Sequence, residues 1–311
     1  MSTIDLTDDQ AGRVAAAGGR VVPVQIGAAP APGDLADVEV WLGEGLTEAV
    51  LQMAPRLAWV QSTSQGVDGI LFDELARSDV VVTNVRGMHA SVTSEHALAL
   101  VLGMARALPQ VVLAQRERAW ATVAGPDLRI IDGSRMVVLG TGAIGRAFAR
   151  RAGALGAHLI GVNRRGTSVE GFEKTYQEAE LSEVAATADW LVLVCPLTSR
   201  TRGIVGARVL ERMRPSSYLV NVSRGPVLDS AALLDALARG RPAGAALDVF
   251  DEEPLAASHP FWTMPNVLVS PHLGGVMPGY MDRAVTYFAD NLRRFRGGEP
   301  LASVVDKGAG Y

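Results

Sequence analysis

The sequence predicts an α/β protein that contains two doubly wound parallel-sheet domains. Short apolar, β-branched segments alternate with Ala-, Leu- and Arg-rich segments of helical character along almost all of the 311 residues. The strand segments are apolar throughout, which is typical of parallel sheets that helices cover on both faces. The alternation runs through two separate series, and a chain of this length exceeds one typical domain.

The first series of elements occupies the N-terminal part of the chain. A Thr7-x-x-Gln10 pattern before an Ala-rich segment indicates a capping box that opens an N-terminal helix. Four mostly apolar segments are then expected as strands, namely residues 21–26, 38–42, 57–61 and 80–83. Helices are expected between them at residues 46–53 and 67–76.

The second series follows a long helical stretch, residues 93–118, which is expected to cross between the domains. Its expected strands are residues 136–139, 158–162, 190–195, 218–222, 245–249 and 267–270. Its expected helices are residues 144–155, 181–186, 206–213 and 230–239. A last helix, residues 278–297, would pack back on the first domain. We therefore expect residues 97–276 to form one domain, inserted into a second domain made of residues 1–96 and 277–311.

Composition and charge argue against several classes of protein. The net charge is −4, so a nucleic-acid-binding function that depends on a basic surface is not expected. No apolar stretch reaches the roughly 18 residues of a membrane span. The first ten residues, MSTIDLTDDQ, are polar and acidic and do not resemble a signal peptide. The only cysteine is Cys195, which excludes an intrachain disulfide and a multi-cysteine metal site. We expect a cytoplasmic enzyme without a metal or a membrane segment.

The strongest local motif follows the first strand of the second series. Residues 136–145 read MVVLGTGAIG, a GxGxxG pattern between a predicted strand and a predicted helix. This context allows a tight turn, and the helix N-terminus offers free N–H groups to a pyrophosphate. The sequence therefore predicts a Rossmann-type dinucleotide site in this loop. Its expected binding residues are Gly140, Thr141, Gly142, Ala143, Ile144 and Gly145.

The end of the next predicted strand bears on the choice of dinucleotide. An Asp or Glu that holds the adenosine ribose is expected about 20 residues after the glycines. Asn163 stands there instead, followed by Arg164 and Arg165. The missing carboxylate removes repulsion of a 2′-phosphate, and the two guanidinium groups offer bidentate phosphate contacts. NADP(H) is therefore favoured over NAD(H), with two solvated loop arginines as the alternative interpretation.

Three further segments place polar side chains just after predicted strands. They contain Arg224 in NVSRG, the carboxylates Asp248 and Glu253 in DVFDEEPL, and His272 in SPHLGG. The carboxyl ends of parallel strands converge on one crevice, so we expect these side chains to meet there. An arginine, a carboxylate and a histidine together suit carbonyl reduction, although each alone has a structural alternative in a cap, a loop or a turn.

In the order and spacing of its motifs, the chain resembles the D-isomer-specific 2-hydroxyacid dehydrogenases over nearly its whole length. The shared motifs are GTGAIG, CPLT with Thr201, NVSRG, DVFDEEPL and SPHLGG. The resemblance implies a Rossmann-type cofactor domain inserted into a flavodoxin-like substrate domain, and a homodimer. It also implies reversible, NAD(P)H-dependent reduction of a small 2-oxo acid to the D-2-hydroxy acid. Glyoxylate or hydroxypyruvate reductase is the favoured subtype.

The resemblance also implies roles for individual residues. Arg224 would bind the carboxylate and carbonyl of the substrate, His272 would be the general acid/base, and Glu253 would be its carboxylate partner. Asp248 would face the nicotinamide carboxamide. The backbone of the loop at residues 64–68 in the first domain would grip the substrate carboxylate. Further implied cofactor contacts are Cys195, Pro196 and Thr201, and the implied substrate contacts are Ser64, Gln65 and Gly66.

One departure from the family pattern bears on the substrate pocket. Gln65 stands where the family usually has Ala or Gly, so a narrow pocket for two- or three-carbon acids is expected.

Three alternative functions stay open. Phosphoglycerate dehydrogenase is less favoured because the chain ends soon after its last helix, and formate dehydrogenase is disfavoured by length and by the Asn163 loop. A dinucleotide-sensing corepressor would need no turnover. The remaining histidines lie in no cluster with the spacing of metal ligands, and His96, in a predicted helix, is interpreted as structural. Cys195 is interpreted as a small buried residue.

Overall fold

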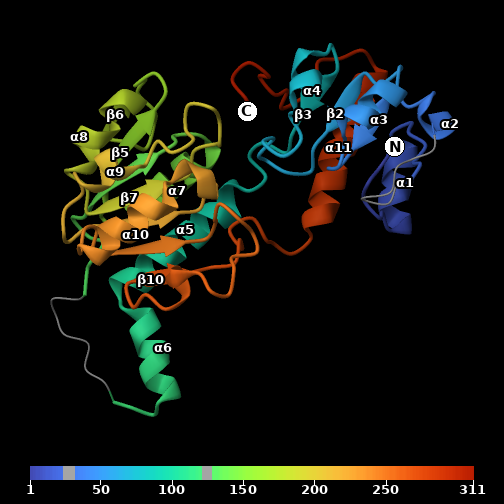
Figure 1. Ribbon diagram of the computed structural model, residues 1–311. Helices are drawn as coiled ribbons and strands as arrows, with labels where there is room; N and C mark the ends of the chain where they lie inside the picture. Colours follow the sequence, from blue (N-terminus) through green and yellow to red (C-terminus); the bar gives the residue numbers. More distant parts are fainter. Residues whose placement is uncertain (24–31, 121–127) are drawn as a thin grey trace. The chain divides into compact units, whose positions relative to one another are not determined.

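The computed structural model describes residues 1–23, 32–120 and 128–311 (Figure 1). It separates into two compact units. Unit 1 comprises Met1–His89 and Met277–Tyr311, and unit 2 comprises Ala90–Val276. The boundary expected between residues 96 and 97 falls inside helix α5 (Ala90–Ala105), and the units divide at the start of that helix. The predicted fold class, an α/β protein with two parallel sheets, is confirmed.

Unit 2 is built around a seven-stranded sheet in which every neighbouring pair of strands is parallel. Its spatial order is β10 (Val267–Val269), β9 (Gly244–Leu247), β8 (Tyr218–Asn221), β7 (Trp190–Leu193), β4 (Arg135–Leu139), β5 (His158–Asn163) and β6 (Lys174–Gln177). The chain enters at β4 and runs outward to β6, then returns and runs outward from β7 to β10. The order therefore reverses between β4 and β7, where doubly wound sheets bind their ligands.

Helices cover both faces of this sheet. The covering helices are α5, α7 (Ala143–Gly153), α8 (Leu181–Ala185), α9 (Ala207–Leu210) and α10 (Ser230–Ala238). Met136 and Val138 of β4 pack in one cluster with residues of α5 and α7. Val137 and Leu139 pack in another with residues of α8, α9 and α10. Successive residues of a strand point to opposite faces of the sheet. The apolar residues of β4 therefore contribute to the hydrophobic clusters on both faces.

Two elements of unit 2 differ from the sequence prediction. The edge strand β6 was not predicted, because KTYQ is polar and half-exposed and lacks the apolar run of a buried strand. The helical stretch expected over residues 93–118 is two helices, α5 and α6 (Leu108–Arg116). Ala107 adopts a left-handed conformation (φ 53°), which ends the helical hydrogen bonding, and Pro109 suits the first turn of a new helix.

None of the helices in the described ranges is by itself both long and apolar enough to cross a membrane. Helices α5 and α6 reach that length and composition only as a pair, and the pair is bent by 67°.

Unit 1 contains a second parallel sheet, β1 (Val40–Leu42), β2 (Trp59–Gln61) and β3 (Val81–Thr83), in that order. Two isolated parallel bridges extend this sheet beyond β1. Ser2 pairs with Leu42 of β1, and Pro23 pairs with Ser2. Counted along the chain, the five paired segments lie in the order 2-1-3-4-5, which is the flavodoxin-like order. The strand expected at residues 21–26 is described only up to Pro23, and its remainder lies outside the described residues.

The helices of unit 1 are α1 (Asp8–Ala16), α2 (Pro32–Leu35), α3 (Glu48–Met53), α4 (Asp73–Arg77) and α11 (Tyr280–Arg296). Helix α4 begins later than the predicted residue 67. The N–H groups of Ile70 and Leu71 both return to the carbonyl of Val67, and Phe72 is extended, so the segment before α4 is a turn. The other predicted helices of this unit agree with the structure within a few residues.

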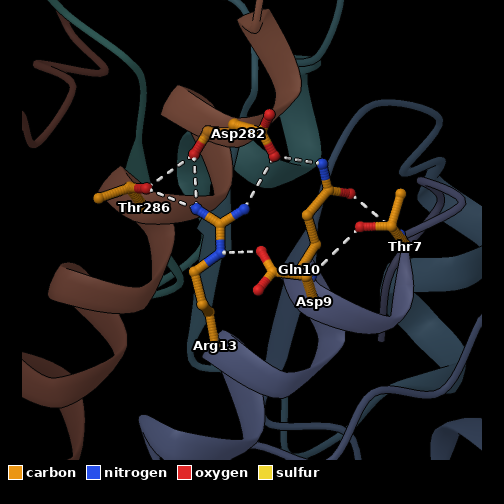
Figure 2. A network of polar contacts seen from close by, with 6 residues as sticks. All are labelled: Thr7, Asp9, Gln10, Arg13, Asp282 and Thr286. Carbon is orange, nitrogen blue, oxygen red and sulfur yellow. Dashed lines mark hydrogen bonds and ion pairs between the residues drawn. The ribbon is translucent and has the colours of Figure 1, made fainter.

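Helices α1 and α11, from opposite ends of the chain, are joined by a polar network (Figure 2). The predicted capping box is confirmed, since Thr7 Oγ1 accepts from Gln10 N and Gln10 Oε1 accepts from Thr7 N. Gln10 Nε2 and Arg13 each donate to the carboxylate of Asp282 at 2.8 Å, and they lower the pKa of this carboxyl group. The last helix therefore packs on the first unit, as predicted.

Candidate functional site

Two positions of the loop between β4 and α7, Gly140 and Gly145, have room only for glycine. Gly140 has φ +107°, and a Cβ there would lie 2.7 Å from the backbone N of Cys195. A Cβ on Gly145 would lie 2.0 Å from the carbonyl oxygen of Gly140. A Cβ on Gly142 would meet nothing within 4 Å. The loop is therefore tightly closed on the sheet side and open at Gly142.

This open side fits a pyrophosphate. Gly142 is the N-cap of α7, and no side chain of the described residues caps the helix. The first N–H groups of a helix have no intrahelical partner, and the helix dipole places positive charge there. Thr141 is buried, and its Oγ1 accepts a hydrogen bond from Asn163 Nδ2 at 3.0 Å, which ties the loop to the end of β5. The residues present thus suit the dinucleotide that the motif predicts.

Asn163 ends β5 and shapes the turn that follows. Besides its bond to Thr141, Asn163 Nδ2 donates to the carbonyl of Thr167 at 3.0 Å, and its Oδ1 accepts from the backbone N of Arg165 at 3.1 Å. The side chains of Arg164 and Arg165 are exposed, and among the described residues neither guanidinium has a hydrogen-bond or ion-pair partner. Two cationic groups thus stand beside the position where a ribose-binding carboxylate is absent.

The loop after β7 contains the other predicted cofactor contacts. Cys195 is buried, and burial raises the pKa of its thiol to about 12, so it is an unreactive neutral side chain. Thr201 is also buried, and its Oγ1 donates to the carbonyl of Pro196 at 2.7 Å and accepts from Thr198 N at 2.8 Å. Thr201 therefore closes this loop, and Pro196 is exposed on it. Within the described ranges, no three His, Cys, Asp or Glu side chains are grouped to hold a metal ion.

Arg224 lies in the turn after β8, held against the turn that follows β9. Asn221 Nδ2 donates to the carbonyl of Arg224 at 3.2 Å. A Cβ on Gly225 would lie 1.9 Å from the carbonyl carbon of Phe250 and 2.0 Å from its oxygen. Since only glycine permits this approach, Gly225 places the Arg224 backbone beside the turn that carries Glu253.

Glu253 and His272 form the predicted pair. One carboxylate oxygen of Glu253 accepts from Phe250 N at 2.9 Å, and the other lies 2.5 Å from His272 Nδ1. The His272 side chain is 46% exposed and that of Glu253 is 33% exposed. The carboxylate thus engages Nδ1 of the imidazole and not Nε2. The structure brings these two side chains and the Arg224 turn to the carboxyl edge of one sheet.

Asp248, directly after β9, is 1% exposed, and its carboxylate accepts four hydrogen bonds from the described residues. The donors are His96 Nε2 at 3.0 Å, Ser270 Oγ at 2.6 Å, Leu273 N at 2.9 Å and Gly274 N at 2.8 Å. Burial acts to raise the pKa of Asp248, but the hydrogen bonds outweigh burial, and the pKa lies below its ordinary value. Asp248 is therefore an ionised, buried carboxylate. His96 and Ser270 were not among the predicted site residues, because His96 lies 152 residues from Asp248 and in no local motif.

In unit 1, the loop that contains Ser64, Gln65 and Gly66 follows β2. The backbone N of Ser64 donates to Ser62 Oγ at 3.0 Å and to Glu44 Oε1 at 3.3 Å, so this amide is already bonded within the unit. The Oε1 atom of Gln65 is buried and has no hydrogen-bond partner in the part of the chain that the structure describes. Sequence reasoning missed Glu44, which adds a carboxylate beside the loop.

Comparisons with known proteins agree with the motifs. A family model described as D-isomer specific 2-hydroxyacid dehydrogenase, NAD binding domain, matches residues 98–274. The chain is 33% identical over 272 residues to a glyoxylate reductase from Thermococcus gammatolerans, an alignment that covers 86% of this chain and 81% of that protein.

Two solved structures are similar over the whole chain. One is a D-isomer specific 2-hydroxyacid dehydrogenase from Xanthobacter autotrophicus Py2 in complex with NADPH and MES, with a TM-score of 0.84, 32% identity and coverage of 100% of this chain and 98% of that one. The other is an NADPH-dependent glyoxylate/hydroxypyruvate reductase from Sinorhizobium meliloti in complex with NADP and sulfate, with a TM-score of 0.84, 27% identity and the same coverage. The chain therefore belongs to the D-isomer specific 2-hydroxyacid dehydrogenase family.

Proposed function

We propose that the protein catalyses the reversible reduction of a small 2-oxo acid, glyoxylate or hydroxypyruvate, to the D-2-hydroxy acid with NADP(H). The observation that carries this proposal is the Glu253–His272 pair, 2.5 Å apart at the edge of the sheet that also carries the dinucleotide loop. A proton-transfer pair beside a hydride source is what carbonyl reduction requires. A cytoplasmic location stays a prediction from the sequence.

The site residues divide the chemistry between them. A bound nicotinamide supplies the hydride in one direction and accepts it in the other. Arg224 would hold the substrate carboxylate in a fork and polarise the adjacent carbonyl. His272, as an imidazolium, would donate its Nε2 proton to the oxygen on which negative charge develops. Glu253 would hold Nδ1 and favour the charged form of the ring. In the oxidative direction, neutral His272 would take the proton from the hydroxyl group.

The cofactor assignment rests on the loop geometry and on the exposed arginines. The N–H groups at the start of α7, next to the open position at Gly142, would hold the pyrophosphate. Arg164 and Arg165 would bind a 2′-phosphate, and no carboxylate at Asn163 would repel it. The loop that includes Cys195, Pro196 and Thr201 would lie against the cofactor through its backbone. Asp248 is proposed as a further contact, near the nicotinamide.

We expect the enzyme to prefer NADPH over NADH by at least about tenfold in kcat/KM, or ~1.4 kcal/mol of differential binding. The double change Asn163→Asp with Arg164→Ala is expected to shift the preference toward NADH, since it removes a cation and adds a ribose-binding carboxylate. Steady-state kinetics with both cofactors measure the ratio. Arg212→Ala, which removes another exposed arginine, is the control. Equal efficiency of the unchanged enzyme with both cofactors would contradict the assignment.

The substrate proposal draws on the loop of unit 1. The Oε1 of Gln65, which is buried without a hydrogen-bond partner among the described residues, is an acceptor that a 3-hydroxyl group of the substrate would satisfy. This feature favours hydroxypyruvate, which carries a 3-hydroxyl group, over pyruvate, which does not.

The expected order of kcat/KM is hydroxypyruvate or glyoxylate first, then pyruvate, then branched and aromatic 2-oxo acids. Arg224→Ala is expected to be nearly inactive on all of them, since a charge-assisted bond of about 1.5–3 kcal/mol and its positioning effect are lost. A panel of 2-oxo acids with NADPH measures the order. Faster turnover of phenylpyruvate than of glyoxylate would refute the pocket argument, and absence of any turnover would favour the corepressor alternative.

We also propose a homodimer in which α6 is covered by a second copy of the chain. None of the side chains of α6 is buried, and the helix extends away from the sheet of unit 2 (Figure 1). Its large apolar residues are 46–57% exposed, namely Leu108, Val111, Val112 and Leu113. Exposed apolar patches of this kind are typical of subunit interfaces, and closed dimers are the commonest assemblies.

The mass in solution, measured by light scattering after gel filtration, is expected to be twice the 32.8 kDa of one chain. The double change Val112→Asp with Leu113→Asp is expected to yield monomers, because two charges would have to be buried at the interface. Gln115→Asp adds a charge to a polar position of the same helix and serves as the control. A monomeric unchanged protein, or a double variant that stays dimeric, would contradict the proposal.

A further inference from the structure

We infer that His96 is a positioning residue for His272, acting through Asp248 and Ser270. The inference rests on the proposed function only in that it takes His272 as the acid/base group. His96 lies in the second turn of α5, and its Nε2 is 3.0 Å from both Asp248 Oδ1 and Ser270 Oγ. Three separate elements of unit 2, α5 and the ends of β9 and β10, therefore meet at this histidine.

The hydrogen bonds require a proton on Nε2 of His96. Ser270 donates its hydroxyl proton to Asp248 Oδ1 at 2.6 Å, so its oxygen can only accept from His96. The ionised carboxylate of Asp248 also accepts only. His96 Nε2–H is thus shared between two acceptors and holds them together. This arrangement is the same whether His96 Nδ1 carries a proton or not.

The carboxylate of Asp248 is occupied by donors of the protein itself. Two carboxylate oxygens offer about four lone-pair sites. Oδ1 accepts from His96, Ser270 and the amide of Leu273, and Oδ2 accepts from the amide of Gly274. Asp248 is therefore the centre of an internal network, and His96 is the donor that links this network to α5.

The network fixes the backbone at His272. His272 has φ +54°, a left-handed conformation that a histidine seldom adopts. Its N–H donates to the carbonyl of Asp248 at 2.8 Å, and the next two amides, of Leu273 and Gly274, donate to the carboxylate of the same residue. One aspartate thus holds three consecutive amides. The direction of the imidazole toward Glu253 follows from this backbone, and a misplacement of about 1 Å in such a group can lower turnover about 100-fold.

His96 supports the turn by packing as well as by hydrogen bonding. A Cβ on Gly274 would lie 2.8 Å from Asp248 Oδ2 and 3.6 Å from His96 Cδ2, so the imidazole forms one wall of the turn. A test must therefore separate the volume of the ring from its donor. Leucine keeps most of the volume and has no donor, whereas glutamine places an N–H donor at nearly the position of Nε2.

The experiment compares His96→Leu with His96→Gln and with His158→Leu as the control. His158 is an exposed histidine at the opposite end of the unit 2 sheet, paired with Glu173. We expect His96→Leu to lower kcat about tenfold or more, because the link that aligns the His272 turn with α5 is lost. NADPH affinity is expected to stay within about twofold, because Asp248 keeps its bonds from Ser270, Leu273 and Gly274. His96→Gln is expected to recover most of kcat, and His158→Leu is expected to leave both quantities unchanged.

A second readout does not depend on turnover. In NMR spectra of protein with labelled histidines, we expect a His96 Nε2–H signal that exchanges slowly with water. The chemical shifts of the His272 ring, which report its position, are expected to change in His96→Leu and to return toward those of the unchanged protein in His96→Gln. These signals stay measurable if no 2-oxo acid proves to be a substrate, so failure of the proposed function is distinguishable from failure of this inference.

Three results would overturn the inference. The first is a His96→Leu variant with unchanged kcat and unchanged chemical shifts of the His272 ring. The second is a His96→Gln variant as impaired as His96→Leu, which would assign the effect to ring volume alone. The third comes from Asp248→Asn: if it weakens NADPH binding and leaves kcat at saturating NADPH unchanged, the carboxylate serves the cofactor and not the His272 turn.

Discussion

Replacement of His272 by alanine is expected to lower kcat by about 10²–10⁴-fold and to leave NADPH affinity nearly unchanged. The imidazole is the group placed to move a proton, since Glu253 engages Nδ1 at 2.5 Å and Nε2 is left for the substrate. The side chain is 46% exposed, so its removal creates no cavity in the core, and the thermal unfolding temperature should change little. Steady-state kinetics and NADPH fluorescence titration measure the two quantities. Near-normal turnover by His272→Ala would reject the site.

Replacement of Glu253 by glutamine tests the pairing itself. If the amide oxygen of the glutamine keeps the bond to Phe250 N, the amide nitrogen faces His272 Nδ1 and donates to it. This arrangement favours the neutral imidazole, so the limb of the pH–rate profile that reports His272 should move to lower pH. Glu252→Gln, at the exposed neighbouring residue, is the matched control. A limb that does not move would mean that the carboxylate does not act on the ring.

Replacement of Gly145 by alanine is expected to abolish NADPH binding and to destabilise the fold. The new Cβ would lie 2.0 Å from the carbonyl oxygen of Gly140, and since that atom belongs to the backbone, the glycine loop must move. Forced overpacking of this kind costs about 1–3 kcal/mol and sometimes more. Because the displaced loop carries the N–H groups that would hold the pyrophosphate, affinity is lost together with stability.

Gly153→Ala is the control for this change, because the residue lies at the other end of the same helix. Its Cβ would meet only Leu159 Cδ2 at 3.6 Å, an ordinary van der Waals contact, and alanine favours a helix by about 0.5–1 kcal/mol over glycine. Urea unfolding and NADPH titration of both variants make the comparison. If Gly145→Ala binds NADPH as Gly153→Ala does, the loop is not the pyrophosphate site.

Elements with a strong local pattern could be predicted from the sequence, and elements set by tertiary contacts could not. The buried strands of the unit 2 sheet are contiguous apolar runs, so β4, β7 and β8 were found nearly to the residue. The polar edge strand β6 has no such run. The break between α5 and α6 occurs at Ala107, a residue whose left-handed conformation has no local sequence signal.

The same distinction holds for the candidate site. Arg224, Glu253 and His272 each stand in a short motif just after a strand, so their meeting at one edge of the sheet follows from topology. His96 carries no motif, and its partners lie on strands far away in the sequence. Glu44 was missed for the same reason, because its bond to the Ser64 loop joins two segments that are adjacent only in the folded unit.

Unit 1 is formed by both ends of the chain, so the ribosome makes its two parts at different times. Unit 2 is one continuous segment, so it can fold as soon as residue 276 has left the ribosome. The first 89 residues cannot complete their core at that time, because Phe288 of α11 stacks on Trp59 of β2 with ring centroids 5.3 Å apart. The part of the chain that is synthesised first is therefore finished last, and until then its apolar surface is open to aggregation and to chaperones.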